Sequence, residues 1–133
     1  MFVDTNYFLR FLLADVTSQY VKAKKLFKEA ATGKVKLTSS IVVFFEIYWV
    51  LGSFYEKKKE ELVKVLENLL EMQFVNWENK KLLIRSVEIY KKTDLDFEDS
   101  YNLMFVEFKK LKKVASFDVK FCKLVKANDS FSG

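Results

Sequence analysis

Hydrophobic residues recur along most of the chain with the three- and four-residue spacing of amphipathic helices. The clearest case is residues 17–32, where Thr17 or Ser18 is the predicted cap and Gly33 the predicted terminator. The apolar side chains of this segment form one stripe: Tyr20, Ala23, Phe27, Ala30 and Ala31. The pattern predicts a surface helix.

The same spacing predicts six further helices. One begins after residues 2–3, where Asp4 and Thr5 make the switch into a helix, and another is capped by Ser39 or Ser40. The helix capped by Ser39 or Ser40 is predicted over residues 41–55. The four remaining helices are predicted over 56–72, 78–92, 97–112 and 119–126. The apolar stretches between the helices are predicted strands: 2–3, 35–37, 74–75 and 114–117.

Short strands that alternate with helices and lack hairpin turn signals indicate parallel βαβ units. The sequence shows no internal repeat and no Pro-, Ser- or Gly-rich linker. We therefore predict one α/β domain over residues 1–133, which at 50% hydrophobic residues is large and apolar enough for a core of its own.

Charges interrupt every long apolar run. The longest run, residues 41–51, is shorter than the roughly 18 residues of a membrane span and contains Glu46. Asp4 precedes the first apolar run and Arg10 divides it, whereas a secretory leader places its positive charge before an unbroken run. A single cysteine, Cys122, excludes an internal disulfide and fits a reducing compartment. We expect a soluble, cytoplasmic protein.

Composition excludes several kinds of catalytic chemistry. The chain has no histidine, which removes histidine bases, Ser-His triads and histidine-ligated zinc. Its three glycines form neither a phosphate-binding loop nor a dinucleotide fingerprint. Any hydrolytic chemistry must therefore rely on carboxylates.

Four carboxylates stand out in the sequence: Asp4, Glu46, Asp99 and Asp118. Asp4 and Asp118 follow predicted strands, and α/β proteins place functional groups at the carboxyl ends of parallel strands. Taken singly, Asp4 and Asp118 can each be explained as the cap of the helix that follows. Asp99 can be explained as an acid in the first turn of a helix, where its charge offsets the helix dipole.

Glu46 has no such ordinary role. It lies inside a predicted helix whose other positions in 41–51 are apolar, so we expect its carboxylate to be buried. An isolated buried carboxylate is costly and needs a partner, either a basic side chain from elsewhere or a divalent cation. Together with Asp4, Asp99 and Asp118, it offers the oxygen ligands that Mg²⁺ or Mn²⁺ prefers.

The acids lie in motifs that resemble those of the PIN-domain ribonucleases, and among them the VapC-like toxins of toxin-antitoxin pairs. "VDTNYFLRFLL" resembles the family's opening strand with its Asp, and "SSIVVFFEIYWVL" resembles the helix that carries its Glu. "LDFEDSYNLMF" is similar to the third motif, an Asp before a small residue, here Asp99-Ser100. "VASFDVKF" resembles the fourth, a strand ending in Thr or Ser, one residue and Asp, here Ser116-Phe117-Asp118.

The resemblance implies a three-layer α/β fold, in which about seven helices flank a short, mostly parallel sheet of four to five strands. It implies a ribonuclease in which Asp4, Glu46 and Asp99 ligate Mg²⁺ or Mn²⁺ and Asp118 ligates a second ion or holds its water. The residues that orient carboxylates or touch phosphate are then Thr5, Asn6, Asp96 and Ser116. Because Asp96 lies one helical turn before Asp99, the third ligand is open between these two.

Charge and apolar surface indicate partners. The chain has a net charge of +5 although the proposed metal site is acidic, so lysine must dominate elsewhere, as in residues 57–59 and 109–113. Such lysine-rich stretches either contact an RNA substrate or form a solvated face of a helix. Arg10 is expected to pair with a carboxylate or to contact an acidic partner. Apolar surface around Tyr20, Phe27 and residues 49–55 exceeds the needs of one small core. The resemblance implies a homodimer and a cognate antitoxin, with DNA contacted only through the antitoxin.

Other classes of protein share single features with this sequence. A phosphatase with an aspartyl nucleophile would have a second Asp at position 6, which is Asn6, and a phospho-acceptor receiver domain has no place for Glu46. A non-catalytic PIN-like binding module would lose metal ligands, whereas all four acids are present. A PIN nuclease that is not a toxin, or an RNA-processing factor, fits the same motifs.

Overall fold

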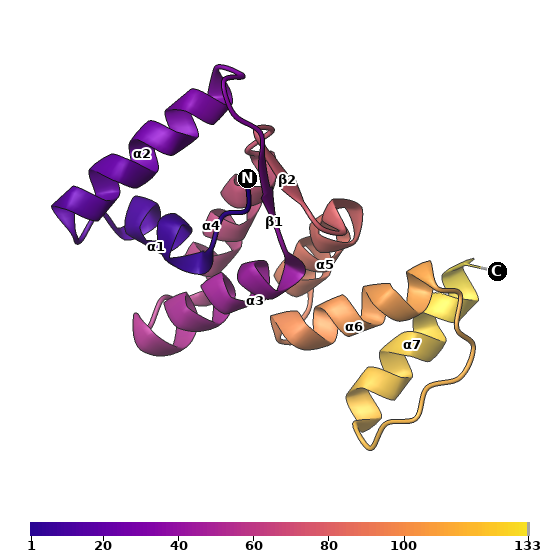
Figure 1. Cartoon of the computed structure of the whole chain (residues 1–133). Coiled ribbons are helices and arrows are strands. Elements are labelled where there is room, and N and C mark those ends of the chain that lie inside the picture. The colour runs from indigo at the N-terminus through magenta and orange to yellow at the C-terminus, as the bar shows by residue number, and fades with distance from the viewer. Residues whose placement is uncertain (133) are drawn as a thin grey trace. The chain divides into compact units, whose positions relative to one another are not determined.

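The computed structural model describes residues 1–132, with side chains up to residue 127, and these residues form two compact units (Figure 1). The first unit is Met1–Lys80 and the second begins at Lys81. Among the described residues, no helix has both the length and the apolar character needed to cross a membrane. That residues 1–133 make up one domain stays a prediction.

A small parallel sheet lies in the first unit. Strand β1 (Leu37–Ser39) pairs with β2 (Val75–Trp77), and on its other side Phe2 forms an isolated parallel bridge to Thr38. The Val3 amide donates to the Thr38 carbonyl over 3.0 Å. In both strands the outer residues are buried and the middle one is exposed. One face of the sheet therefore packs on the core and the other is polar.

The sheet is smaller than the predicted four to five strands. Within the described residues it has two strands and the bridge at Phe2. These lie at the predicted segments 2–3, 35–37 and 74–75, but β1 and β2 each end two residues later than predicted and share only Leu37 and Val75 with the predicted ranges. The predicted strand at 114–117 is wrong, because this segment is irregular and three of its four residues are exposed. No backbone-to-backbone hydrogen bond links it to another described segment. An apolar sequence alone does not make a strand when its backbone groups lack a partner.

Helices surround the sheet of the first unit: α1 (Thr5–Leu13), α2 (Thr17–Ala31), α3 (Ile41–Trp49), the π-helix η1 (Val50–Phe54) and α4 (Lys59–Glu71). The predicted helix 41–55 is thus divided, since its last part is π-helical. The predicted start of α4 is also wrong, because Glu56 has a positive φ of 53° and does not continue the preceding helix.

Capping residues explain where these helices begin and end. The Ser40 hydroxyl accepts the Val43 amide over 3.2 Å, which confirms one of the two predicted caps for α3. Capping of α2 by Thr17 or Ser18 is wrong, because Thr17 is already helical and the residue before it makes no side-chain bond. Gly33 follows α2 with a φ of +85°, a conformation that favours glycine.

Trp77 of β2 is the centre of the core of the first unit. Its ring lies 4.9 Å from that of Phe8 and 5.2 Å from that of Phe44, and its indole N–H donates to the Leu69 carbonyl over 3.1 Å. Phe27 packs 5.4 Å from Phe8 and is buried. The prediction that Phe27 adds to a surplus apolar surface is therefore wrong. Its ring helps to hold α2 on the core.

The second unit consists of three helices: α5 (Lys80–Lys92), α6 (Phe97–Phe108) and α7 (Val119–Ser132). They enclose a buried apolar cluster: Leu82, Leu95, Leu103, Met104, Phe121 and Val125. An ion pair between Asp94 and Lys120 joins the segment before α6 to α7. All three helices were predicted, with different bounds: α5 begins two residues later than predicted and α7 continues beyond residue 126. Helix α6 ends at Phe108, before the predicted residue 112, because Lys110 has a positive φ of 55°.

Candidate functional site

Asp4 lies where the chain leaves the sheet and enters α1. The Val3 amide is bound to β1, and one residue later the Asp4 carboxylate accepts the Thr5 amide over 2.8 Å as the cap of α1. The Asp4 side chain is exposed. The predicted switch from strand to helix is therefore confirmed, and it leaves this carboxylate accessible.

A short hydrogen bond connects the start of α1 to α3. The Thr5 hydroxyl, only 4% exposed, donates to Glu46 Oε2 over 2.7 Å. Hydrogen bonds of this length to a carboxylate are among the stronger ones in proteins. Because Thr5 directly follows Asp4, the bond brings the two predicted ligands of the first unit to the same helix start.

Glu46 is exposed, and the prediction of a buried carboxylate is wrong. Helix α3 buries one face, with Val43, Phe44 and Ile47, and leaves Val42 exposed on the same face as Glu46. An apolar helix can expose apolar residues, so composition did not reveal which face points outward. Water reaches the Glu46 carboxylate, and a basic partner is not required to stabilise it.

Asp96 and Asp99 have different roles at the start of α6. The Asp96 carboxylate accepts the Asp99 amide over 2.8 Å, which confirms Asp96 as the predicted cap. The buried Ser100 hydroxyl donates to the Asp96 carbonyl over 2.8 Å. Asp99 itself is half-buried in the first turn. The backbone amide of Asp99 is the donor in the capping hydrogen bond, and the Asp99 carboxylate takes no part in that bond.

Negative charge concentrates around Asp99. Partial burial, together with the charges of Asp96 and Asp118, raises the pKa of the Asp99 carboxyl, while Lys120 opposes the effect. Partial burial also raises the pKa of Glu98, and the charges of Asp96 and Asp99 add to the effect. Carboxylates arranged so that each disfavours the ionisation of its neighbour are common at functional sites, and a bound cation relieves their repulsion.

Asp118 caps α7 and is itself held by Ser116. The Asp118 carboxylate accepts the Phe121 amide over 3.0 Å, and the Asp118 amide donates to the Ser116 hydroxyl over 3.0 Å. Both residues line a cavity of about 350 Å³ that Asp99 and Lys113 also line. Ser116 thus contacts the backbone of Asp118 and not its carboxylate, and the role of Ser116 as a residue that orients a carboxylate or touches phosphate stays a prediction.

The predicted ligands therefore form two groups, one in each unit. In the described part of either unit, no three acidic or cysteine side chains come close enough to hold a metal ion by themselves. The donor chemistry does fit a hard divalent cation, because Asp4, Glu46, Asp99 and Asp118 all offer carboxylate oxygens. The crowding of acids around Asp99 is also what such a cation would relieve. That Asp4, Glu46 and Asp99 ligate an ion, and that Asp118 ligates a second ion or holds its water, stays a prediction.

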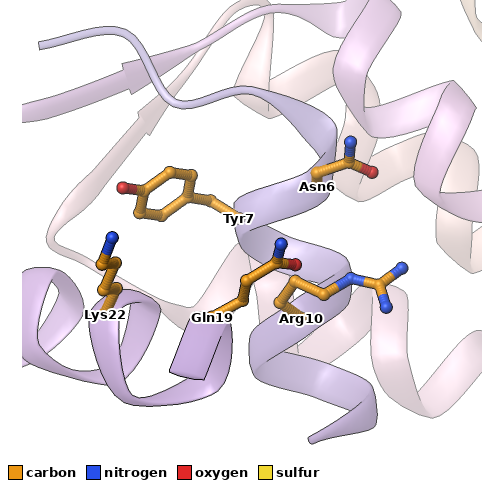
Figure 2. A pocket seen from close by; sticks show the side chains of 5 residues that line it. All are labelled: Asn6, Tyr7, Arg10, Gln19 and Lys22. Atoms are coloured by element: carbon orange, nitrogen blue, oxygen red, sulfur yellow. The ribbon is translucent and has the colours of Figure 1, made fainter. Parts of the chain in front are cut away.

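A second hollow, of about 280 Å³, lies between α1 and α2 (Figure 2). It is lined by Asn6, Tyr7, Arg10, Gln19 and Lys22. Gln19 and Lys22 were not among the predicted site residues. They are spaced by three residues on a helix, which places both on one side of α2, and this spacing was the available signal.

Comparison with known proteins matches residues 1–127 to the PIN domain. A VapC ribonuclease from Aquifex aeolicus (strain VF5) is 25% identical over 122 residues, which cover 92% of this chain and 90% of that protein. No solved structure shows significant similarity to the chain.

The chain belongs to the PIN-domain family, because the match covers nearly all of it, including both groups of acids. Its similarity to a VapC ribonuclease over almost its whole length makes it a VapC-like member of that family.

The Thr5–Glu46 bond gives a prediction about metal affinity. Thr5→Val keeps the shape of the side chain and removes the donor, so the Glu46 carboxylate loses its orientation. Residues that orient metal ligands typically contribute about 10- to 100-fold in affinity. We expect Thr5→Val to weaken Mn²⁺ binding, measured by calorimetric titration, by a factor in this range. Thr5→Ser keeps the hydroxyl and should bind Mn²⁺ like the unaltered protein. Equal affinity of all three proteins would contradict the role of Thr5.

Proposed function

We propose that this chain is a divalent-metal-dependent endoribonuclease that hydrolyses RNA phosphodiester bonds and acts as the toxin of a type II toxin-antitoxin pair. The observation that carries the proposal is the hydrogen bond from Thr5 to Glu46, which brings the acid of α3 to the helix start that Asp4 caps. Membership of the PIN-domain family and similarity to a protein named VapC ribonuclease support it.

The proposed ligands of Mg²⁺ or Mn²⁺ are Asp4, Glu46, Asp99 and Asp118. When bound, such a cation lowers the pKa of an attacking water and stabilises negative charge on the phosphate oxygens. Since the chain has no histidine, the carboxylate oxygens of these acids are its proton acceptors near neutral pH.

Neighbouring residues hold the Glu46 carboxylate and the backbone of Asp99 and Asp118 before substrate arrives. The Thr5 hydroxyl fixes Glu46, the Ser116 hydroxyl accepts the amide of Asp118, and the Asp96 cap fixes the backbone at Asp99. Fixed orientation lowers the reorganisation needed during reaction. The Asn6 amide, one residue after Thr5, is proposed to donate to a phosphate oxygen of the substrate.

A basic stretch in the second unit suits a polyanionic substrate. All five residues from 109 to 113 are exposed, and Lys113 lines the cavity that Asp99 and Asp118 also line. A lysine beside carboxylates can contact the phosphate that the acids are proposed to cleave. The net charge of +5 further favours association with RNA.

The proposed partners are a second copy of the chain and a cognate antitoxin, with DNA contacted only through the antitoxin, and the proposed place of action is the cytoplasm. Exposed apolar side chains on α3 and η1 support an interface between copies. Phe54, at the end of η1, is 76% exposed and makes an edge-to-face contact with its neighbour Tyr55, its only ring contact among the described residues. Val42 and Trp49 of α3 are exposed as well, and several exposed apolar side chains on consecutive elements, unlike a single one, favour an interaction surface.

The first test of the function is Glu46→Gln. The glutamine amide oxygen can still accept the hydrogen bond from Thr5, so we expect the fold and its stability to be kept. The loss of one ligand charge should abolish cleavage of single-stranded RNA in Mn²⁺, measured by gel assay, with a fall of at least about 100-fold. The control is Glu60→Gln, an exposed acid of α4, which should cleave normally. Undiminished cleavage by Glu46→Gln would remove Glu46 from the mechanism.

Substitutions of Asp96 and Asp99 should have different effects on stability, Mn²⁺ affinity and RNA cleavage. Asp96→Asn keeps an oxygen that can cap the Asp99 amide, so it should cost little stability and only part of the activity. Asp99→Asn should lose Mn²⁺ affinity and most of the cleavage, while the metal-free protein gains stability because repulsion with Asp96 and Asp118 is relieved. Calorimetry, urea unfolding and RNA cleavage on both variants decide the point. Loss of metal by Asp96→Asn instead would place the third ligand one helical turn earlier.

The dimer is tested through Phe54. Phe54→Lys places a charge on an exposed apolar position of η1, and two such charges repel across a symmetric interface. We expect sedimentation of the unaltered chain to show a dimer at micromolar concentration and that of Phe54→Lys to show a monomer. The control is Phe108→Lys, since Phe108 is also exposed but lies at the end of α6. A monomeric unaltered chain that also fails to bind the neighbouring gene's product would contradict both proposed partners.

A further inference from the structure

The hollow between α1 and α2 has polar walls. Asn6, Tyr7 and Arg10 line it from α1, and Gln19 and Lys22 line it from α2. Figure 2 shows the Lys22 side chain rising from α2 toward the Tyr7 ring, with the Gln19 amide between Tyr7 and Arg10. The volume of about 280 Å³ is close to the lower limit of common ligand pockets. The hollow can therefore hold one small planar or anionic group.

The two cations of the hollow differ in availability. The Arg10 guanidinium donates to both carboxylate oxygens of Asp15 over 2.9 Å, which confirms that Arg10 pairs with a carboxylate. Lys22 is exposed and forms no ion pair with any side chain in the described part of the chain. An ammonium group of this kind is free to bind an incoming anion such as a phosphate.

The remaining walls suit a nucleobase. The Tyr7 side chain is 41% exposed, so part of its ring is available for stacking. The Gln19 amide carries donors and an acceptor, which can pair with the edge of an unstacked base, and the Asn6 amide can donate to a phosphate oxygen. A flat ring, two amides and one free cation together match a nucleotide better than they match an acidic side chain, which would use the cation alone.

The hollow also lies next to the candidate site. Asn6 and Tyr7 are in the first turn of α1, immediately after Asp4 and Thr5. Three residues of helix advance only about 4.5 Å along the axis. The first residues that line the hollow therefore lie within one helical turn of Asp4 and of Thr5, whose hydroxyl holds Glu46.

We infer that the hollow between α1 and α2 binds the nucleotide next to the scissile phosphate of the RNA, with Lys22 on its phosphate and Tyr7 stacked on its base. This inference rests on the proposed function, because it assigns a subsite to the same substrate. Lys22 and Tyr7 position the RNA and touch no reacting atom. Gln19 hydrogen-bonds to the base edge and gives the subsite its preference among bases, while Asn6 keeps its proposed contact with a phosphate oxygen.

The test measures binding without cleavage. A short single-stranded RNA is titrated by fluorescence anisotropy with the Glu46→Gln protein, alone and combined with Lys22→Ala, Lys22→Arg or Lys25→Ala. Loss of one charged phosphate contact should raise the dissociation constant roughly tenfold and reduce the slope of log affinity against log salt by about 1. Lys22→Arg should restore both values. Lys25→Ala removes an exposed lysine of α2 outside the hollow and should change neither.

The stacking contact is tested with the same protein. Tyr7→Ala should weaken binding roughly tenfold, as loss of one stacked base does, whereas Tyr7→Phe should bind like the parent. With an RNA that carries an abasic ribose at the adjacent position, the difference between Tyr7→Ala and the parent should disappear. Thermal unfolding of each variant checks that the fold is kept. If an alanine variant unfolds, Lys22→Gln and Tyr7→Leu remove the charge and the aromatic ring with side chains of similar size, and the same losses are expected of them.

The outcomes separate this inference from the proposed function. If the protein with Glu46 intact cuts no RNA but the Lys22 and Tyr7 effects are seen, the proposed function fails, and the hollow is retained as an RNA-binding site without a scissile phosphate beside it. If it cuts RNA while Lys22→Ala and Tyr7→Ala leave affinity and salt dependence unchanged, the subsite is overturned. The same holds if the two variants weaken only the binding of an acidic protein partner, because the hollow is then a protein contact. Absence of any RNA binding overturns the subsite as well.

Discussion

The geometry of the first unit depends on the two-sided pairing of Thr38 in the middle of β1. On one side its backbone exchanges hydrogen bonds with the first residues of the chain, through Met1 and Val3, and on the other β1 pairs with β2. The Ser39 hydroxyl adds a bond of 2.7 Å to the Val3 carbonyl. Asp4 directly follows one of these bonded segments and Ser40, the cap of α3, directly follows the other. The register of a three-residue strand thus sets the two helix starts side by side, and only then can Thr5 reach Glu46.

The second unit places its acids by a different means. Asp96 and Asp118 each accept the amide of the third residue of the helix that they precede, and these local bonds fix the carboxylates without help from a sheet. Asp99 is brought near Asp118 because α6 and α7 pack on a common apolar cluster. Long-range strand pairing orders one group of candidate ligands, whereas helix capping and helix packing order the other.

Sequence alone predicted the features that depend on local chemistry. The caps by Ser40 and Asp96 were predictable because a side chain and an amide three residues apart decide them. The family motifs were predictable because their spacing is linear. The exposure of Glu46 was not, since a helix that is apolar on every face gives no sign of which face the core covers. The irregular course of residues 114–117 could not be predicted from the sequence either, because strand formation depends on a partner strand that is remote in sequence.

The capping carboxylates have a consequence for the energetics of ligand binding. Asp4 and Asp118 each use an oxygen to satisfy a helix amide, so their rotamers are already restricted in the folded protein. Ordering a flexible acidic side chain opposes association by about 0.5–1.5 kcal/mol. Here that loss of conformational entropy has already been incurred during folding. A ligand that either residue recognises therefore meets a preorganised group, and its affinity reflects contacts more than the ordering of that side chain.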